Sequence, residues 1–245
     1  MLRIGVLYPL HSAEDDYPIM AARLEPPVEV AVVHTDAVDL HTVEDCRRTG
    51  DWYHLEPGAA ALRTLGVDVC MWACTSGSFV YGLAGAEEQA RQLGNYLGVP
   101  ASSTSLSFVN SIQALGITRV AVAATYPEAL ATEFVGFLAE GGIQVVHLGS
   151  LGIWTAVEVG EVGGEEVIDF VRANDHAGAE AILVPDTALH TVAFLSELDS
   201  AVGKPVLTAN QVTMWEALRL GGRVRRQGGF GQLFALAGDR VGEQE

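Results

Sequence analysis

Residues 67–77 read VDVCMWACTSG, an apolar run that ends in a small polar turn. Such a run leading into Thr, Ser and Gly is typical of a buried parallel strand followed by a helix. Cys74 lies where this strand ends, and in open α/β sheets ligands bind at the carboxyl ends of the strands. A thiol beside two hydroxyls and a glycine is a candidate nucleophile or proton carrier. The alternative is a buried cysteine that packs as a small hydrophobic side chain.

The composition limits the classes of partner and location. The chain has 245 residues, 49% of them apolar and 18% charged, which indicates a globular protein of one large domain or two lobes. The net charge of -17 argues against nucleic acid and anionic membranes, because Lys and Arg supply the affinity for phosphate. No segment approaches the roughly 20 apolar residues of a membrane helix. Three cysteines and a start without a signal sequence predict a cytoplasmic protein.

The second half of the chain repeats the first. Residues 119–127, 178–187 and 204–221 echo residues 3–9, 66–75 and 99–116, in the same order. Residues 3–9 and 119–127 both end in Tyr-Pro. In 66–75 and 178–187, the residue that closes the strand lies eight positions after a glycine and is followed by a threonine. Three ordered echoes predict two similar α/β lobes with a cleft between them. We expect the lobes at 1–112 and 113–222, followed by a flexible tail at 223–245.

Under this repeat, Asp186 takes the place in the second lobe that Cys74 takes in the first. A thiol and a carboxyl would then approach a ligand from opposite sides. Each is followed by a threonine, Thr75 or Thr187, whose N–H and hydroxyl can bind an anion. This arrangement suits moving a proton on or off a carbon next to a carboxylate. The alternative role for Asp186 is the N-cap of a helix over 188–198.

Two polar loops follow the first strands. Residues 11–16 follow the strand at 3–9 and are expected to form a pocket wall, which makes Pro9 and Ser12 candidate substrate contacts. Residues 35–56 are acidic and irregular, and they predict a solvated lid or interface loop. The possible metal ligands in this segment are His41, Asp45, Cys46 and His54, and His34 lies immediately before it. The spacing matches no standard zinc pattern, so no metal site is expected. Neither Cys46, in this acidic loop, nor Cys70, in mid-strand, is expected to rival Cys74.

These residues resemble the aspartate/glutamate racemase superfamily, on the branch that holds maleate cis-trans isomerases and arylmalonate decarboxylases. The resemblance is carried by residues 72–76, 124–126, 150–153, 185–187 and 210–220, and spans about residues 1–222. It implies an α/β fold of two pseudo-symmetric flavodoxin-like (Rossmann-like) lobes, each with a mainly parallel four-stranded sheet. It also implies an active site in the cleft between the lobes and no cofactor.

The resemblance assigns roles to single residues. Cys74 matches the first of two cysteines that the racemases and maleate isomerases use, one per lobe, as nucleophile or proton carrier. Thr75 and Ser76 match groups that hold a substrate carboxylate, and Tyr126 matches a tyrosine that hydrogen-bonds the same region. Asp186 replaces the second cysteine.

Two further departures concern the substrate. The two asparagines of the isomerases are absent near Ser12 and near Ala156, which argues against maleate itself. The decarboxylases also lack these asparagines, but they keep the second-lobe cysteine and lack the first, the reverse of this chain.

Three functions follow as hypotheses. The first is a cofactor-independent isomerase or racemase-type enzyme that acts on a small organic acid with Cys74 and Asp186 on opposite faces. The second is a decarboxylase of a substituted malonate, in which Cys74 protonates the carbanion. The third is a non-catalytic protein that kept the pocket. A homo-oligomer is left open. An apolar wall is expected from four residues whose alternative role is core packing: Trp72, Phe79, Ile153 and Trp154.

Overall fold

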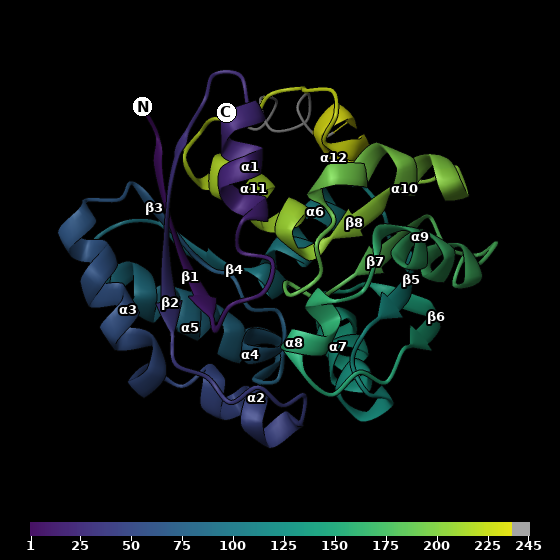
Figure 1. Cartoon of the computed structure of the whole chain (residues 1–245), viewed down its shortest axis with the longest axis horizontal. Coiled ribbons are helices and arrows are strands. Elements are labelled where there is room, and N and C mark those ends of the chain that lie inside the picture. The colour runs from purple at the N-terminus through teal and green to yellow at the C-terminus, as the bar shows by residue number, and fades with distance from the viewer. Residues whose placement is uncertain (237–245) are drawn as a thin grey trace.

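The repeat in the sequence is also a repeat in the fold. The computed structural model describes residues 1–236, and Figure 1 shows two lobes side by side. Each lobe contains a four-stranded, all-parallel sheet, with strand order β2-β1-β3-β4 in the first lobe and β6-β5-β7-β8 in the second. The two orders are the same when the strands are counted within each lobe. The predicted α/β fold class is therefore confirmed.

The first lobe contains β1 (Arg3–Pro9), α1 (Asp16–Arg23), β2 (Glu29–Thr35), α2 (Val43–Thr49), α3 (Trp52–Leu65), β3 (Val69–Trp72), α4 (Ser76–Phe79), α5 (Gly82–Leu97), β4 (Ala101–Ser103) and α6 (Thr104–Leu115). The second lobe contains β5 (Arg119–Ala124), α7 (Glu128–Glu140), β6 (Gln144–Ser150), α8 (Ala156–Gly160), α9 (Gly164–Ala173), β7 (Ala181–Val184), η1 (Val192–Phe194), α10 (Leu195–Val202), β8 (Val206–Thr208), α11 (Ala209–Leu220) and α12 (Gly231–Leu236).

The three sequence echoes correspond to equivalent elements. They are β1 and β5, β3 and β7, and the strand–helix units β4-α6 and β8-α11. All four residues of β3 and of β7 are buried, as expected for inner strands of parallel sheets with both faces covered. Because parallel neighbours end at the same edge, the turn after β3 lies beside the end of β1, and the turn after β7 lies beside the end of β5.

Helices α6 and α11 join the lobes in the middle of the molecule (Figure 1). The hydroxyls of Thr104 and Thr213 lie 2.7 Å apart, and Asn110 Nδ2 donates a hydrogen bond of 2.8 Å to Glu216 Oε1. Apolar residues of both lobes form one shared core cluster. The expected division between residues 112 and 113 falls within α6, whereas residues 116–118 connect the two halves.

Several helix ends differ from the sequence prediction. Helix α3 begins at Trp52, within the segment expected to be irregular, because the Asp51 side chain accepts the Tyr53 N–H at 2.9 Å. The segment expected to be irregular contains α2, whose N-cap is Thr42. No regular helix follows Asp186 directly, and the first helical turn begins at Val192.

The segment after residue 222 packs against the body of the protein. Phe230, Leu233 and Phe234 are buried in the shared core, and Gln211 Nε2 donates a hydrogen bond of 2.6 Å to the Phe230 carbonyl. The expected flexible tail is therefore wrong for this packed part, because its aromatic residues bury apolar surface. Residues 237–245 of that expected tail lie outside the described residues. Among the helices that the structure describes, none is both long and apolar enough to span a bilayer.

Candidate active site

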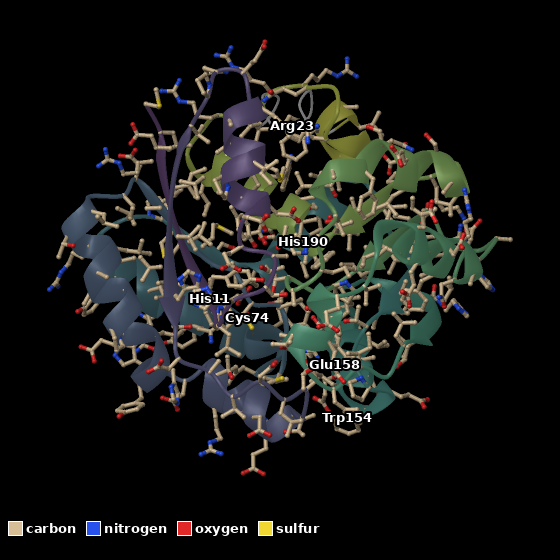
Figure 2. The ribbon with its side chains drawn as sticks, in the orientation of Figure 1. His11, Arg23, Cys74, Trp154, Glu158 and His190 are labelled. Carbon is tan, nitrogen blue, oxygen red and sulfur yellow. The ribbon has the colours of Figure 1, made fainter. Side chains whose placement is uncertain are left out.

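A narrow cavity of about 40 Å³ lies between the lobes, and both Cys74 and Asp186 line it. Figure 2 shows Cys74 near the middle of the molecule, where the two lobes meet. The juxtaposition that the repeat predicts is therefore present. The cavity has room for about three water-sized groups, so a larger ligand requires movement of its walls.

The turn after β3 holds the Cys74 sulfur against backbone donors. Its Sγ accepts the Gly77 N–H at 3.3 Å and lies 3.8 Å from Ser76 Oγ. A Cβ at Gly77 would lie 3.0 Å from the sulfur, so this close approach favours glycine. Burial raises the pKa of the Cys74 thiol to about 11, and the nearby Asp186 also raises it, whereas the Gly77 and Ser76 hydrogen bonds lower it. The thiol therefore keeps its proton at neutral pH.

Asp186 is held at the end of β7 by two donors. Thr125 Oγ1 donates to its Oδ2, and the Ala188 N–H donates to its Oδ1 at 3.0 Å. The carboxyl is buried, with 4% of the residue exposed. The bond to Ala188 is a local turn bond of the kind that the alternative N-cap role implies, but the same side chain also borders the cavity.

Two buried tyrosines fix the turn that carries Asp186. Tyr126 donates to the Pro185 carbonyl, and Tyr8 donates to the Thr187 carbonyl at 2.9 Å. Burial raises the pKa of both phenols well above the usual value, so both stay protonated. Both line the cavity, but only Tyr126 was expected there.

The other expected substrate contacts differ in their surroundings. Pro9, Ser76 and Thr187 line the cavity. Thr75 is not among the lining residues, and its buried hydroxyl interacts with the Tyr126 side chain. Ser12 is not among the lining residues, because its hydroxyl donates to the Ala188 carbonyl at 2.8 Å and so joins the two lobes.

The prediction that Trp72, Phe79, Ile153 and Trp154 form an apolar wall is wrong. Trp72 and Phe79 are buried in the core, Ile153 packs against a second-lobe cluster, and Trp154 is 53% exposed. None of the four lines the cavity. Its apolar lining comes instead from short loops at the strand ends: Pro9, Leu10, Ala37, Val38, Leu40, Ala156 and Ala188.

Leu10 has an unusual backbone conformation for its residue type. Its φ of 55° lies in the left-handed region that branched side chains rarely adopt. Backbone strain of this kind is often found at functional sites, and Leu10 borders the cavity.

Residues 37–41, in the loop between β2 and α2, line one side of the cavity, and we call this segment the lid. It is fastened to the second lobe at three points. Asp39 Oδ1 accepts the Ala156 N–H at 2.5 Å, the His41 N–H donates to the Trp154 carbonyl at 2.7 Å, and His41 Nδ1 lies 3.0 Å from the Ile153 carbonyl. Because a carbonyl only accepts, Nδ1 carries the proton in the neutral ring, which leaves Nε2 as an acceptor.

His41 and Cys46 are site residues that the sequence reasoning did not identify. His41 borders the cavity, and its ring meets Tyr126 edge to face at 5.1 Å. Cys46 lies on α2 with 4% of its surface exposed and also lines the cavity. Burial raises the pKa of Cys46 to about 12, so this thiol is also protonated at neutral pH. The segment had no regular pattern from which its direction could be predicted.

The comparisons with known proteins show the family to which the chain belongs. Residues 36–234 match the family model described as arylmalonate decarboxylase. The chain belongs to the arylmalonate decarboxylase family. It is similar to the arylmalonate decarboxylase of Bordetella bronchiseptica, with 30% identity over 202 residues, which cover 81% of this chain and 79% of the relative.

Solved structures show the same similarity. A liganded mutant of arylmalonate decarboxylase, in which a glycine is replaced by cysteine and a cysteine by serine, is 27% identical with a TM-score of 0.84. The match covers 96% of this chain and 99% of that one. A mutant of Nocardia farcinica maleate cis-trans isomerase with a covalently bound succinylcysteine intermediate has a TM-score of 0.89 over 96% of this chain and 98% of its own. At 20% identity, that second likeness shows the fold alone. The resemblance to this branch is thereby confirmed, and the named relatives are enzymes.

Proposed function

We propose that this member of the arylmalonate decarboxylase family removes CO₂ from a small substituted malonate and that Cys74 protonates the resulting carbanion. The observation that carries the proposal is the position of the Cys74 thiol, which lines the cavity and accepts the Gly77 N–H at 3.3 Å. Burial raises its pKa to about 11, so the group reaches the substrate as S–H. A thiol that keeps its proton is better suited to act as an acid than as a nucleophile.

The proposed step balances within the substrate and Cys74. The bond between the central carbon and one carboxylate breaks, and its electron pair passes into the remaining carboxylate as an enediolate. The S–H proton then forms the new C–H bond, and the thiolate takes a proton from solvent. The Gly77 N–H, 3.3 Å from the sulfur, would stabilise that thiolate.

Donors near the cavity would stabilise the enediolate. The Ser76 hydroxyl lies 3.8 Å from the Cys74 sulfur, and both Ser76 and Thr187 line the cavity. Preorganised donors of this kind stabilise charge that develops in the transition state.

The apolar part of the cavity would take the organic substituent. Leu10, Val38 and Leu40 approach it from loops of the first lobe, and Ala156 and Ala188 from the second. An apolar contact with the leaving carboxylate would also favour its loss as neutral CO₂. A substituted malonate is larger than the cavity of about 40 Å³, so its binding requires the walls to move outward.

A second candidate is an isomerase or racemase-type reaction on a small carboxylic acid. The observation that favours it is Asp186, a carboxyl from the other lobe in the same cavity as Cys74. Two groups able to exchange a proton, one from each lobe, suit reversible proton transfer at the carbon next to a carboxylate. Maleate is not proposed, since the hydroxyl of Ser12 already donates to the Ala188 carbonyl and Ala156 offers no side-chain donor.

The experiment is a parallel incubation with alkyl- and aryl-substituted malonates and with chiral 2-substituted monocarboxylates. CO₂ release from the malonates supports the decarboxylase, and loss of optical activity without CO₂ supports the racemase-type reaction. If neither occurs but the acids raise the melting temperature, the protein is a binding protein and both proposals fail. The matched variants are Cys74→Ser and Cys46→Ser, because both thiols line the cavity.

A further inference from the structure

We infer that His11, Glu14 and His34 form a binding site for a first-row divalent transition metal ion such as Zn²⁺ or Co²⁺. The two histidines face one carboxylate oxygen. His11 Nδ1 lies 2.9 Å and His34 Nε2 lies 3.2 Å from Glu14 Oε1. One ligand atom from each residue lies within 4.8 Å of the others, and no other such group occurs among the described residues.

The spacing fits a single ion. Ligand atoms about 2.0–2.1 Å from a tetrahedral Zn²⁺ lie roughly 3.3 Å from one another. The two separations to Glu14 Oε1, 2.9 Å and 3.2 Å, are close to that value. The rings of His11 and His34 have centroids 3.8 Å apart, and the His11 side chain is 74% exposed, so few contacts oppose its adjustment to an ion. Three protein ligands would leave a position open to water or an anion.

The fold positions two of the three ligands before any ion arrives. His34 belongs to β2 and pairs in register with Tyr8 of β1, so the parallel ladder fixes its backbone. The second Glu14 oxygen accepts the Ser12 N–H at 2.7 Å, which leaves Oε1 directed at the histidines. A hydrogen bond to the distal oxygen of a ligating carboxylate is the usual outer support of a metal ligand.

The charges also favour a cation. The Glu14 carboxylate faces two imidazoles and accepts the Ser12 N–H at 2.7 Å, in a chain of net charge -17. Two imidazoles and one carboxylate are a ligand set for Zn²⁺, Co²⁺, Ni²⁺ or Fe²⁺ rather than for Ca²⁺ or Mg²⁺, which prefer oxygen ligands.

The location suggests a use at the mouth of the cavity. His11 directly follows Pro9 and Leu10, which line the cavity. An ion in this loop would place positive charge beside the entrance for an anionic acid. Metal binding stands independently of the reaction, because none of its ligands lines the cavity.

The test titrates chelator-treated full-length protein with Co²⁺ and follows visible absorption, with Zn²⁺ calorimetry as a second measurement. We expect one ion per chain, and an affinity at least about 10-fold lower in each of His11→Ala, His34→Ala and Glu14→Gln. His190→Ala is the matched control, since His190 is an exposed histidine that pairs with a single carboxylate, Asp15, at 2.9 Å. It should bind as wild type.

Several outcomes would overturn the inference. They are no Co²⁺ bound by the wild type, equal affinity in the three ligand variants, or a thiolate-to-cobalt absorption band that disappears in Cys74→Ser or Cys46→Ser. Side-chain exposure of 74% at His11 means that at least its alanine variant will fold, so the comparison remains available if another variant does not.

Discussion

Cys74 and Asp186 border one cavity from different lobes, but their contacts differ in kind. The sulfur of Cys74 carries a transferable proton and accepts the Gly77 N–H at 3.3 Å. The carboxyl of Asp186 is fixed by the Thr125 hydroxyl and by the Ala188 N–H. This asymmetry makes the first lobe the side from which we expect the proton to arrive.

A decarboxylation product should therefore have the opposite handedness to that of the family's second-lobe cysteine enzymes. The resemblance implies that those decarboxylases carry their cysteine where this chain has Asp186. Delivery of the proton by Cys74 would reach the other face of the planar enediolate. Chiral chromatography of the product of a prochiral disubstituted malonate, run beside the Bordetella bronchiseptica enzyme, measures this. The same enantiomer from both proteins would place the proton donor elsewhere.

The hydrogen bond from the Ala156 N–H to the Asp39 side chain should control access to the cavity. Asp39→Ala removes the acceptor of the Ala156 N–H, a loss of roughly 0.5–2 kcal/mol for a capping contact. We expect faster amide hydrogen exchange over residues 37–41 and a changed KM with a smaller change in kcat. The matched control is Asp36→Ala, which alters an exposed carboxylate in the same loop. Equal amide exchange rates in the two variants would show that the Asp39 hydrogen bond does not hold the lid in place.

Two substitutions at His41 can separate its role in anchoring the lid from a role in contacting the substrate. Asparagine at this position can still donate a hydrogen bond to the Ile153 carbonyl, as Nδ1 does now at 3.0 Å, but it lacks the Nε2 acceptor. If Nε2 contacts the substrate, His41→Asn and His41→Ala both lower kcat/KM, while only His41→Ala speeds exchange of the lid amides. Full activity in His41→Asn would limit His41 to anchoring the lid.

Alkaline pH should destabilise the fold through its buried thiols. Burial raises the pKa of Cys70 to about 12 and that of Cys74 to about 11, from an ordinary value of 9.0. Unfolded thiols lose their protons first, so stability is full below about pH 9 and falls as the pH rises toward the folded values. Each thiol contributes up to about 1.4 kcal/mol per pH unit. Urea unfolding from pH 8 to about 10 should show a shallower fall in Cys70→Ala. Parallel slopes for both proteins would contradict this.

Slow alkylation of Cys74 would not by itself indicate a binding protein. A thiol with its pKa raised to about 11 is alkylated slowly at neutral pH even in an active enzyme. Alkylation that accelerates with pH would fit either function, so turnover is the measurement that separates them.

The sequence predicted the elements that follow a regular pattern. The apolar runs at β1, β3, β5 and β7 and the spacing shared by the two halves were enough to predict two similar α/β lobes, and the resemblance implied their parallel sheets. They also predicted that Cys74 and Asp186 share a cavity, because each follows an inner strand of its sheet.

The remaining site residues depend on loop conformation. His41 and Cys46 reach the cavity because Asp39 and Thr42 fix the lid and the start of α2, and neither contact has a periodic signal. Trp72 was misplaced because alternate residues of a strand face opposite sides of a sheet, and its side faces the core. The packing after residue 222 depends on contacts distant in sequence, such as Gln211 with the Phe230 carbonyl.

The most direct test of the central claim is deuterium incorporation at the carbon next to the carboxylate, followed by NMR in D₂O for wild type and Cys74→Ser. The substrates are the substituted malonates and 2-substituted monocarboxylates named above. If Cys74 transfers the proton, wild type labels that carbon in at least one acid, and Cys74→Ser does so about 10²- to 10⁴-fold more slowly at an unchanged melting temperature. Equal labelling by both proteins, or none with any acid, would contradict the account.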